Sequence, residues 1–410
     1  MIFDMNKKHV AVFSIPVIVA ALGYFVDIYD LLLFAIVRIP SLKSLGLSTT
    51  DIDKQGELIL GVQMVGLLIG GIIWGIAGDK KGRLSILFGS IILYSLANIA
   101  NGFVQTVPQY AIARFIAGIG LAGELGGGIT LVAELLKKEQ RGIGTSLVAG
   151  LGLTGAVVAF FISQKYDWRI CYFIGGGLGF LLLLMRVSVF ESGMYQSMDQ
   201  SVSKGNFLMF FNNGKRFKKY ACSILLGLPT WYVIGILIAF SNKFAKSFGI
   251  NEDVSPGKAT MYAYIAISIG DVLAGLLSHV LKSRKKALYV FYVLTIIMIS
   301  LYFMQTSAST AATMYWISGG LGLATGFWAI FVTMGAEQFG TNLRATAATT
   351  IPNMVRGSLP LMLLVFNALQ HYFSYVMSGL ITGIVVMIIS IAAAALTEET
   401  FHKELDYIEM

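Results

Sequence analysis

A long apolar run of this sequence ends in the charged stretch Gly75-Ile76-Ala77-Gly78-Asp79-Lys80-Lys81-Gly82-Arg83. The run before it, residues 56–79, is long enough to cross the roughly 30 Å hydrocarbon core of a bilayer as a helix. Runs of this kind recur from the N-terminus almost to the C-terminus. A chain that must satisfy its backbone inside lipid with such long spans forms a helix bundle rather than a barrel.

The composition excludes an ordinary soluble protein. Of the 410 residues, 56% are hydrophobic and only 13% are charged, which is too few to cover a water-facing surface of normal size. Apolar runs bounded by charges or turn residues predict twelve transmembrane helices. They cover residues 10–38, 56–79, 84–104, 108–136, 142–164, 168–187, 217–243, 259–281, 286–305, 310–337, 344–370 and 373–396.

The basic residues indicate topology rather than nucleic-acid binding. The net charge is +8, but lysine and arginine collect in short clusters between the spans and not along one soluble face. Nearly all of these clusters fall on one side of the predicted membrane, which is therefore the cytoplasmic side. Both termini are predicted to be cytoplasmic.

The chain reads as two similar halves joined by a polar linker. We expect an N-terminal six-helix bundle (1–187), a cytoplasmic linker (188–216), a C-terminal six-helix bundle (217–396) and a cytoplasmic tail (397–410). Gly75-Ile-Ala-Gly-Asp79 has a counterpart in Gly275-Leu-Leu-Ser-His279 at the end of the eighth span. Glu134 precedes Arg141 by seven residues, and Glu337 precedes Arg344 by the same seven. These repeats at equivalent places indicate an internal duplication.

The opening motif resembles the signature of the major facilitator superfamily. Gly75-x-x-x-Asp79-Lys80-x-Gly82-Arg83 is similar to the cytoplasmic loop of that superfamily between its second and third helices, and Arg114-Phe-Ile-Ala-Gly118-x-Gly120 resembles its fourth-helix motif. The resemblance covers essentially the whole chain. It implies an all-α membrane protein with twelve transmembrane helices in two pseudo-symmetric six-helix bundles.

Other motifs favour one branch of the superfamily. Gly23-Tyr-Phe-Val-Asp27-Ile-Tyr-Asp30 resembles the first helix of proton-coupled phosphate and metabolite symporters, and Gly123-Glu124 resembles the metabolite:proton symporters. The phosphate symporters usually carry Asp-Tyr-Pro where Glu124-Leu125-Gly126 stands here. The proline of the fifth-helix motif of drug antiporters is missing from Gly150-Leu-Gly-Leu-Thr-Gly155. Symport is favoured over efflux.

Charged residues at membrane depth are the candidate functional residues, because a bare charge there costs several kcal/mol. Carboxylates in a central cavity can exchange protons, and an arginine can attract an anionic or zwitterionic substrate. We expect proton coupling from Asp27, Asp30, Arg114 and Glu124, and the resemblance strengthens the first three. We expect substrate binding from Tyr24, Glu124, Trp231, Asp271, Trp328 and Arg356. The alternative is that the charges form structural ion pairs and that the aromatic rings only pack between helices.

The residues at the cytoplasmic helix ends are expected to hold the two halves together when the cavity faces outward. Ion pairs at this level would form and break as the halves rock. His279 replaces an acid of the second half, so the second contact should be weaker. The expected gating residues are Gly75, Asp79, Gly82, Arg83, Glu134, Arg141, Glu337 and Arg344.

The sequence therefore predicts a secondary active transporter of the cell inner membrane and not an enzyme. No nucleotide-binding loop, metal-ligand cluster or nucleophile triad stands out, so neither a cofactor nor a metal is expected. The expected partners are a small-molecule substrate, protons and membrane lipid, with no nucleic acid, and the chain is expected to be a monomer. The leading hypothesis is proton-coupled symport of a small organic acid, amino acid or related zwitterion by alternating access. The alternatives are an inorganic phosphate:proton symporter and a proton-coupled exporter of cationic compounds.

Overall fold

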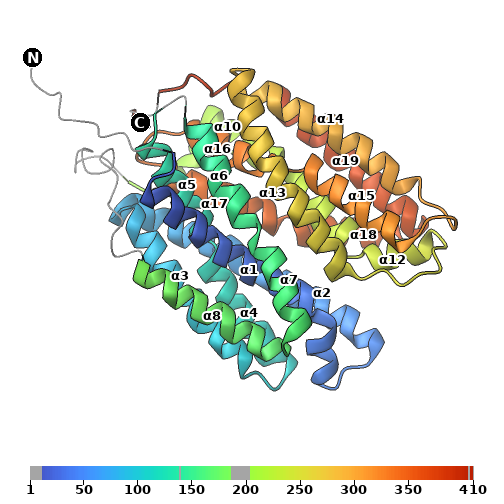
Figure 1. Ribbon diagram of the computed structural model, residues 1–410. Coiled ribbons are helices and arrows are strands. Elements are labelled where there is room, and N and C mark those ends of the chain that lie inside the picture. The colour runs from blue at the N-terminus through green and yellow to red at the C-terminus, as the bar shows by residue number, and fades with distance from the viewer. Residues whose placement is uncertain (1–11, 138–139, 186–203, 405–406, 410) are drawn as a thin grey trace, which may run out of the picture.

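The structure is a computed structural model that describes residues 12–137, 140–185, 204–404 and 407–409. Every regular element in these residues is a helix, and Figure 1 shows the helices running side by side. The N-terminal helices are α1 (Ile15–Ser44), α2 (Thr49–Lys81), α3 (Arg83–Gly102), α4 (Val107–Leu121), α5 (Glu124–Leu135), α6 (Arg141–Leu153), α7 (Gly155–Lys165) and α8 (Trp168–Met185). The C-terminal helices are η2 (Phe207–Phe210), α10 (Gly214–Leu226), α11 (Leu228–Tyr232), η3 (Val233–Ile238), α12 (Ser241–Ser247), α13 (Pro256–Val280), α14 (Arg284–Phe303), α15 (Ala311–Ala324), α16 (Trp328–Glu337), α17 (Arg344–Gly357), α18 (Leu359–Leu369) and α19 (Tyr375–Leu396).

Among the described residues, ten helical stretches are long and apolar enough to cross a membrane, and Ile86–Gly102 is a shorter apolar helix. The predicted span 344–370 is also helical, as α17 and α18, but it is not one of the ten. Its first part, α17, is rich in threonine and carries Asn353 and Arg356. The chain is therefore a multi-pass helical membrane protein, while the count of twelve spans and the orientation of the termini remain predictions.

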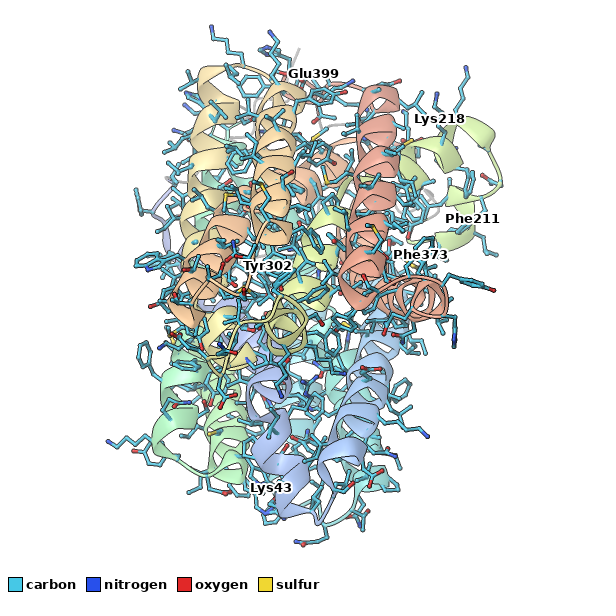
Figure 2. All side chains as sticks on the ribbon, turned by 90° about the vertical axis from the view of Figure 1, so that its right-hand side faces the viewer. Lys43, Phe211, Lys218, Tyr302, Phe373 and Glu399 are labelled. Atoms are coloured by element: carbon cyan, nitrogen blue, oxygen red, sulfur yellow. The ribbon has the colours of Figure 1, made fainter. Side chains whose placement is uncertain are left out.

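The outer surface of the bundle is strongly apolar. Large side chains such as Leu184, Trp316 and Val280 are each more than 70% exposed, and similar residues follow most of the helices. A soluble monomer rarely exposes so much contiguous apolar surface, whereas lipid accepts it. Figure 2 shows Lys43 and Glu399 at opposite ends of the molecule, so charged groups mark both ends.

Several of the long helices are interrupted near their middle. The fourth predicted span breaks between α4 and α5, and the tenth breaks between α15 and α16. The seventh span breaks at Gly227, which precedes Pro229 of the five-residue helix α11, and it continues as the π-helix η3. Interruptions of this kind expose backbone groups and redirect side chains, and π-helical turns often occur at functional sites.

The N-terminal and C-terminal helices meet along two equivalent pairs of elements, α2 with α17 and α6 with α13. A Cβ atom on Gly75 would lie 2.9 Å from the Cα atom of Thr346, and one on Gly275 would lie 2.3 Å from the Ser146 hydroxyl oxygen. Glycine is required at both places because the neighbouring helix comes so close. The repeated glycines of the sequence thus form matching contacts between the two sets of helices.

Candidate functional site

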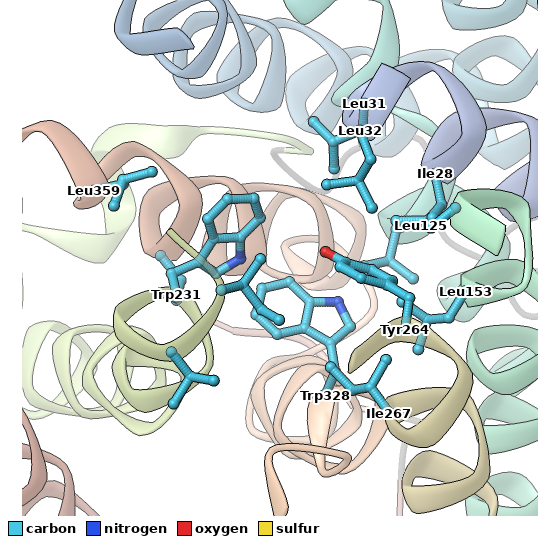
Figure 3. Packing of buried hydrophobic residues seen from close by; sticks show 14 of the residues in the cluster. Ile28, Leu31, Leu32, Leu125, Leu153, Trp231, Tyr264, Ile267, Trp328 and Leu359 are labelled. Atoms are coloured by element: carbon cyan, nitrogen blue, oxygen red, sulfur yellow. The ribbon is translucent and has the colours of Figure 1, made fainter. Parts of the chain in front are cut away.

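A small central chamber lies where the interrupted helices meet. Its void is about 250 Å³, but the centre of a water molecule fits in only about 10 Å³ of it, so a solute enters only when the lining side chains move. All of the lining residues are buried. Figure 3 shows Trp231, Tyr264 and Trp328 facing one another beside Ile28 and Leu153. The lining residues are Tyr24, Ile28, Leu31, Leu153, Thr230, Trp231, Tyr264, Ile267, Trp328 and Arg356.

Arg356 of α17 is the one charged residue in the described lining. One of its terminal nitrogens donates to the Asn353 side-chain oxygen at 3.2 Å, and the other lies 3.5 Å from the Tyr24 hydroxyl. The guanidinium carbon lies 5.5 Å from the centre of the Trp328 ring, so the cation rests over an aromatic face. The Nε atom has no hydrogen-bond partner.

Within the described part of the chain, Arg356 differs from the other arginines that are less than 2% exposed. Arg114 pairs with Asp30 at 3.0 Å, Arg284 with Glu337 at 2.8 Å and Arg344 with Glu134 at 3.1 Å. Arg356 has neutral hydrogen-bond partners only. A buried cation without a carboxylate is costly, so this site favours the arrival of an anion.

Asp27 of α1 is completely buried, and neither of its carboxylate oxygens has a hydrogen-bond partner. The charges that act on it come from Arg356, Glu124 and Asp30. It lies three residues beyond Tyr24, nearly one helical turn, and therefore lies close to the chamber. A buried carboxyl group without a donor is far more stable as the neutral acid than as the anion, which suits it to carry a proton.

Asp30 belongs to a tighter network. Arg114 of α4 donates to the Asp30 carboxylate at 3.0 Å, to its backbone carbonyl at 3.3 Å and to the Asn98 side-chain oxygen at 2.8 Å. The guanidinium carbon of Arg114 also lies 4.8 Å from the centre of the Tyr172 ring. Two of the residues expected to couple protons therefore touch each other, and Asn98 of α3 was missed from the sequence.

The other two acids predicted at membrane depth do not line the chamber. Glu124 begins α5, and its carboxylate accepts a hydrogen bond from the Ser90 hydroxyl at 2.8 Å. Asp271 of α13 accepts a hydrogen bond from the backbone N–H of Ala329 at 2.9 Å. It thus caps the N-terminus of α16, which is the role a carboxylate commonly plays at a helix start. Of the six expected substrate-binding residues, the structure brings Tyr24, Trp231, Trp328 and Arg356 together.

Asp79 joins the two sets of helices at the ends that are predicted to face the cytoplasm. Its carboxylate accepts hydrogen bonds from the backbone N–H groups of Ala345 and Thr346, at 3.1 and 2.8 Å, and from the Thr346 hydroxyl at 2.6 Å. It therefore caps α17 from across the interface. Beside it, the buried Glu134–Arg344 pair also crosses between the two sets. We call these contacts of Asp79, Glu134 and Arg344 the cytoplasmic latch.

The remaining predicted gating residues are placed less symmetrically. Glu337 pairs with Arg284. The Arg284 guanidinium also lies so close to Gly142, at the start of α6, that a Cβ atom there would meet it. Arg141 donates from Nε to the backbone carbonyl of Ala133 at 2.9 Å. Gly82 has a φ of 97° and joins α2 to α3, a turn that favours glycine. The side chain of Arg83 lies outside the described residues.

We expect Asp79→Asn to loosen the cytoplasmic latch. The amide keeps the shape but removes the negative charge and turns a donor toward the N–H groups of α17. Losing charge-assisted bonds worth roughly 1.5–3 kcal/mol should raise labelling of single cysteines in the cytoplasmic half of the cavity by about tenfold. Labelling on the outer side should fall.

His279→Asn is the matched control, because His279 stands at the equivalent place of the repeat and cannot supply a permanent negative charge. It should change labelling much less. Equal shifts from the two substitutions, or no shift from Asp79→Asn, would contradict a gating role for the motif.

The tail after α19 packs beside the cytoplasmic latch. Glu399 accepts hydrogen bonds from the backbone N–H groups of Arg284 and Lys285, at 3.0 and 3.2 Å, and from the Ser283 hydroxyl. It therefore caps α14. Further along, Asn342 and Glu409 exchange two hydrogen bonds of 3.0 and 2.9 Å. Asn342 lies just before Leu343, the residue that precedes α17, so the tail supports the loop on which the latch depends.

The tail contact of Glu399 should respond to acid. Burial raises the pKa of this carboxyl group, but the hydrogen bonds from Ser283 and the backbone N–H groups of Phe401, Arg284 and Lys285 outweigh it and hold the pKa below its ordinary value. The stabilisation is therefore present above the unfolded pKa of about 4.3 and is lost as the pH falls through the lower folded value. Hydrogen exchange at residues 283–286, corrected for its intrinsic pH dependence, should accelerate only below about pH 4.

Glu399→Gln should show the faster exchange at every pH, whereas the exposed neighbour Glu398 serves as a control through Glu398→Gln. Exchange that is equally slow in wild type and Glu399→Gln would show that the cap does not hold the tail.

Contacts also join the two sets of helices at the opposite end. Lys243 of α12 lies 3.9 Å from Glu57 of α2, and the Arg38 guanidinium lies 5.6 Å from the centre of the Phe240 ring. The chamber is therefore closed from both ends, which agrees with the burial of its lining.

Comparison with known proteins places these features in a family. The sequence profile described as Major Facilitator Superfamily matches residues 20–358. A putative metabolite transport protein of Haemophilus influenzae is 25% identical over 94% of this chain and 96% of its own length. The niacin transporter NiaP of Acinetobacter baylyi is 30% identical over 38% of this chain, and the match spans only 36% of that protein. The sialic acid transporter NanX of Escherichia coli is 31% identical over 54% of this chain and 55% of its own.

A solved structure agrees with the fold. The proton:xylose symporter XylE, bound to 6-bromo-6-deoxy-D-glucose, superimposes with a TM-score of 0.78 over 98% of both chains, at 18% sequence identity. This likeness concerns the helical architecture alone.

Proposed function

This chain belongs to the major facilitator superfamily, and we propose that it is a proton-coupled symporter for a small carboxylic acid with a flat ring. Members of the family are transporters rather than enzymes. We place it in a bacterial-type inner membrane with its termini in the cytoplasm, where alternating access to the central chamber would carry the acid inward.

The observation that carries this proposal is the unpaired guanidinium of Arg356. It is 1% exposed, lines the chamber and has no carboxylate partner among the described residues. A substrate carboxylate can accept two parallel hydrogen bonds from a guanidinium, a geometry that a single charge cannot reproduce. The weak 3.5 Å contact with Tyr24 is the one such a ligand would most easily replace.

The other walls of the chamber favour a ring. Tyr24, Trp231, Tyr264 and Trp328 surround the space, and aromatic side chains stack well on flat unsaturated groups. The described lining contains no acid that could bind the ammonium of an amino acid or a cationic drug. Inorganic phosphate would need more donors than one arginine supplies. Niacin and sialic acid, the cargoes in the names of two relatives, are both carboxylic acids.

Asp27 is the group we assign to the proton. Among the described residues, Arg356 is the one cation whose charge acts on it, so a substrate carboxylate that neutralises Arg356 would make the proton on Asp27 more stable. Substrate and proton would then bind together, which is the requirement for symport. Asp30, Arg114 and Glu124 remain candidate members of the same proton path.

Uptake by proteoliposomes tests this function. The panel should contain ring carboxylates, aliphatic acids, amino acids, phosphate and organic cations, each with and without an inward proton gradient. We expect only ring carboxylates to accumulate, and only with the gradient, after correction for the neutral acid that crosses protein-free liposomes. Accumulation of a cation or of phosphate, or uptake that ignores the gradient, would contradict the proposal.

A further inference from the structure

The chamber contains two more buried polar atoms that no described residue satisfies. The hydroxyl oxygen of Thr230 and the indole nitrogen of Trp328 have no hydrogen-bond partner, and both residues are 97% buried in the lining. Leaving such a group unsatisfied costs roughly 1–3 kcal/mol. Two of them beside the same small space point to a ligand that satisfies them.

Thr230 lacks a hydrogen bond that many threonines of the described helices make. A threonine in or at the end of a helix often donates to the carbonyl four residues earlier, as seven others do in the described residues. For Thr230 that carbonyl belongs to Leu226, and it already accepts a hydrogen bond from the Tyr292 hydroxyl at 2.7 Å. The interruption at Gly227 also separates Thr230 from the preceding helix. Its hydroxyl is therefore available to the chamber.

Trp328 is held at the start of α16 by the cap that Asp271 makes with the next residue. Its ring face receives the Arg356 guanidinium, so its N–H edge is left for another contact. In Figure 3 that edge turns toward Tyr264. An indole N–H can only donate, so the group it binds must be an acceptor.

We propose that Thr230 and Trp328 recognise an oxygen substituent on the ring of the substrate, while Arg356 holds its carboxylate. The inference rests on the proposed function and narrows it to ring acids such as hydroxybenzoates. An oxygen atom fits better than a ring nitrogen, because its two lone pairs can serve both residues, whereas a ring nitrogen has one. A methyl group of the same size would leave both donors unpaired.

The test compares the binding of 3- or 4-hydroxybenzoate with that of the methylbenzoate substituted at the same ring position. Binding is measured as competition against the uptake of benzoate. We expect wild-type protein to prefer one hydroxy acid by about tenfold or more, since a site with buried donors rejects a ligand that lacks the acceptor. Thr230→Val and Trp328→Phe should each reduce this ratio severalfold, and Thr230→Ser should restore it.

The matched control is Thr130→Val. Thr130 of α5 is also buried with an unpartnered hydroxyl but does not line the chamber. The ratio should stay at its wild-type value in this variant. This result would show that the loss of a buried threonine hydroxyl elsewhere does not change the preference for the hydroxy acid.

The outcomes separate the two proposals. Uptake of benzoate that depends on Arg356, without any preference for the hydroxy acid, would overturn the role of Thr230 and Trp328 and leave the proposed function standing. A wild-type preference for the hydroxy acid in both Thr230→Val and Trp328→Phe would also overturn this role and leave the proposed function standing. Failure of every ring acid to bind would overturn both.

Discussion

Asp27→Asn is expected to abolish concentrative uptake while the protein still exchanges substrate across the membrane. Asparagine keeps the shape of the side chain but cannot bind and release a proton. The internal-to-external concentration ratio driven by a pH gradient should therefore fall to about one, whereas exchange of labelled for unlabelled substrate needs no net proton movement and should continue. Both quantities can be measured in the same proteoliposomes.

Asp253→Asn is the control for this result, because Asp253 is exposed before α13 and does not line the chamber. It should accumulate substrate as the wild type does. Accumulation by Asp27→Asn that equals wild type at several pH values would remove Asp27 from the coupling mechanism.

Arg356→Lys is expected to weaken substrate binding far more than it lowers the amount of folded protein. The ammonium is a point charge and cannot form the two parallel hydrogen bonds of a guanidinium with a carboxylate. The loss of one such charge-assisted bond, roughly 1.5–3 kcal/mol, corresponds to a rise in Kd of about tenfold to a hundredfold. Binding to purified protein in detergent, by titration calorimetry, measures it directly.

The same exchange at Arg169 provides the control. Arg169 of α8 lies outside the chamber lining, with its guanidinium 4.1 Å from the centre of the Trp168 ring, so Arg169→Lys should leave the Kd unchanged. Wild-type affinity in Arg356→Lys would show that Arg356 has a structural role.

The positions of the long helices could be predicted because lipid imposes the same requirement on every span, a long apolar helix that satisfies its own backbone. The interruptions could not. Hydropathy is continuous across the break between α15 and α16, and the new helix start at Trp328 depends on Asp271, 57 residues earlier in the chain. Such a break is determined by a tertiary contact rather than by a local sequence preference.

The membrane depth of the candidate site residues could be predicted, but the direction in which their side chains point could not. Membrane depth placed Asp271 and Arg356 near the same level, yet Asp271 turns to the backbone of α16 and Arg356 turns to the chamber. Tyr264 was missed, although it stands seven residues before Asp271, two turns along the same helix. Arg284 is absent from the predicted gating residues, because nothing local reveals its buried pair with Glu337. Sequence spacing gives the height of a side chain on a helix, while its partners depend on how the helices pack.

The most direct test of symport is to record proton entry together with substrate entry. Proteoliposomes that contain a pH-sensitive dye, with equal pH inside and outside, receive external ring carboxylate, and the signal from protein-free liposomes is subtracted. The account predicts that the lumen acidifies with substrate uptake in wild-type protein and that neither Asp27→Asn nor Arg356→Lys acidifies it at the same substrate concentration. Net uptake of the carboxylate that depends on Arg356 but leaves the luminal pH unchanged would contradict it.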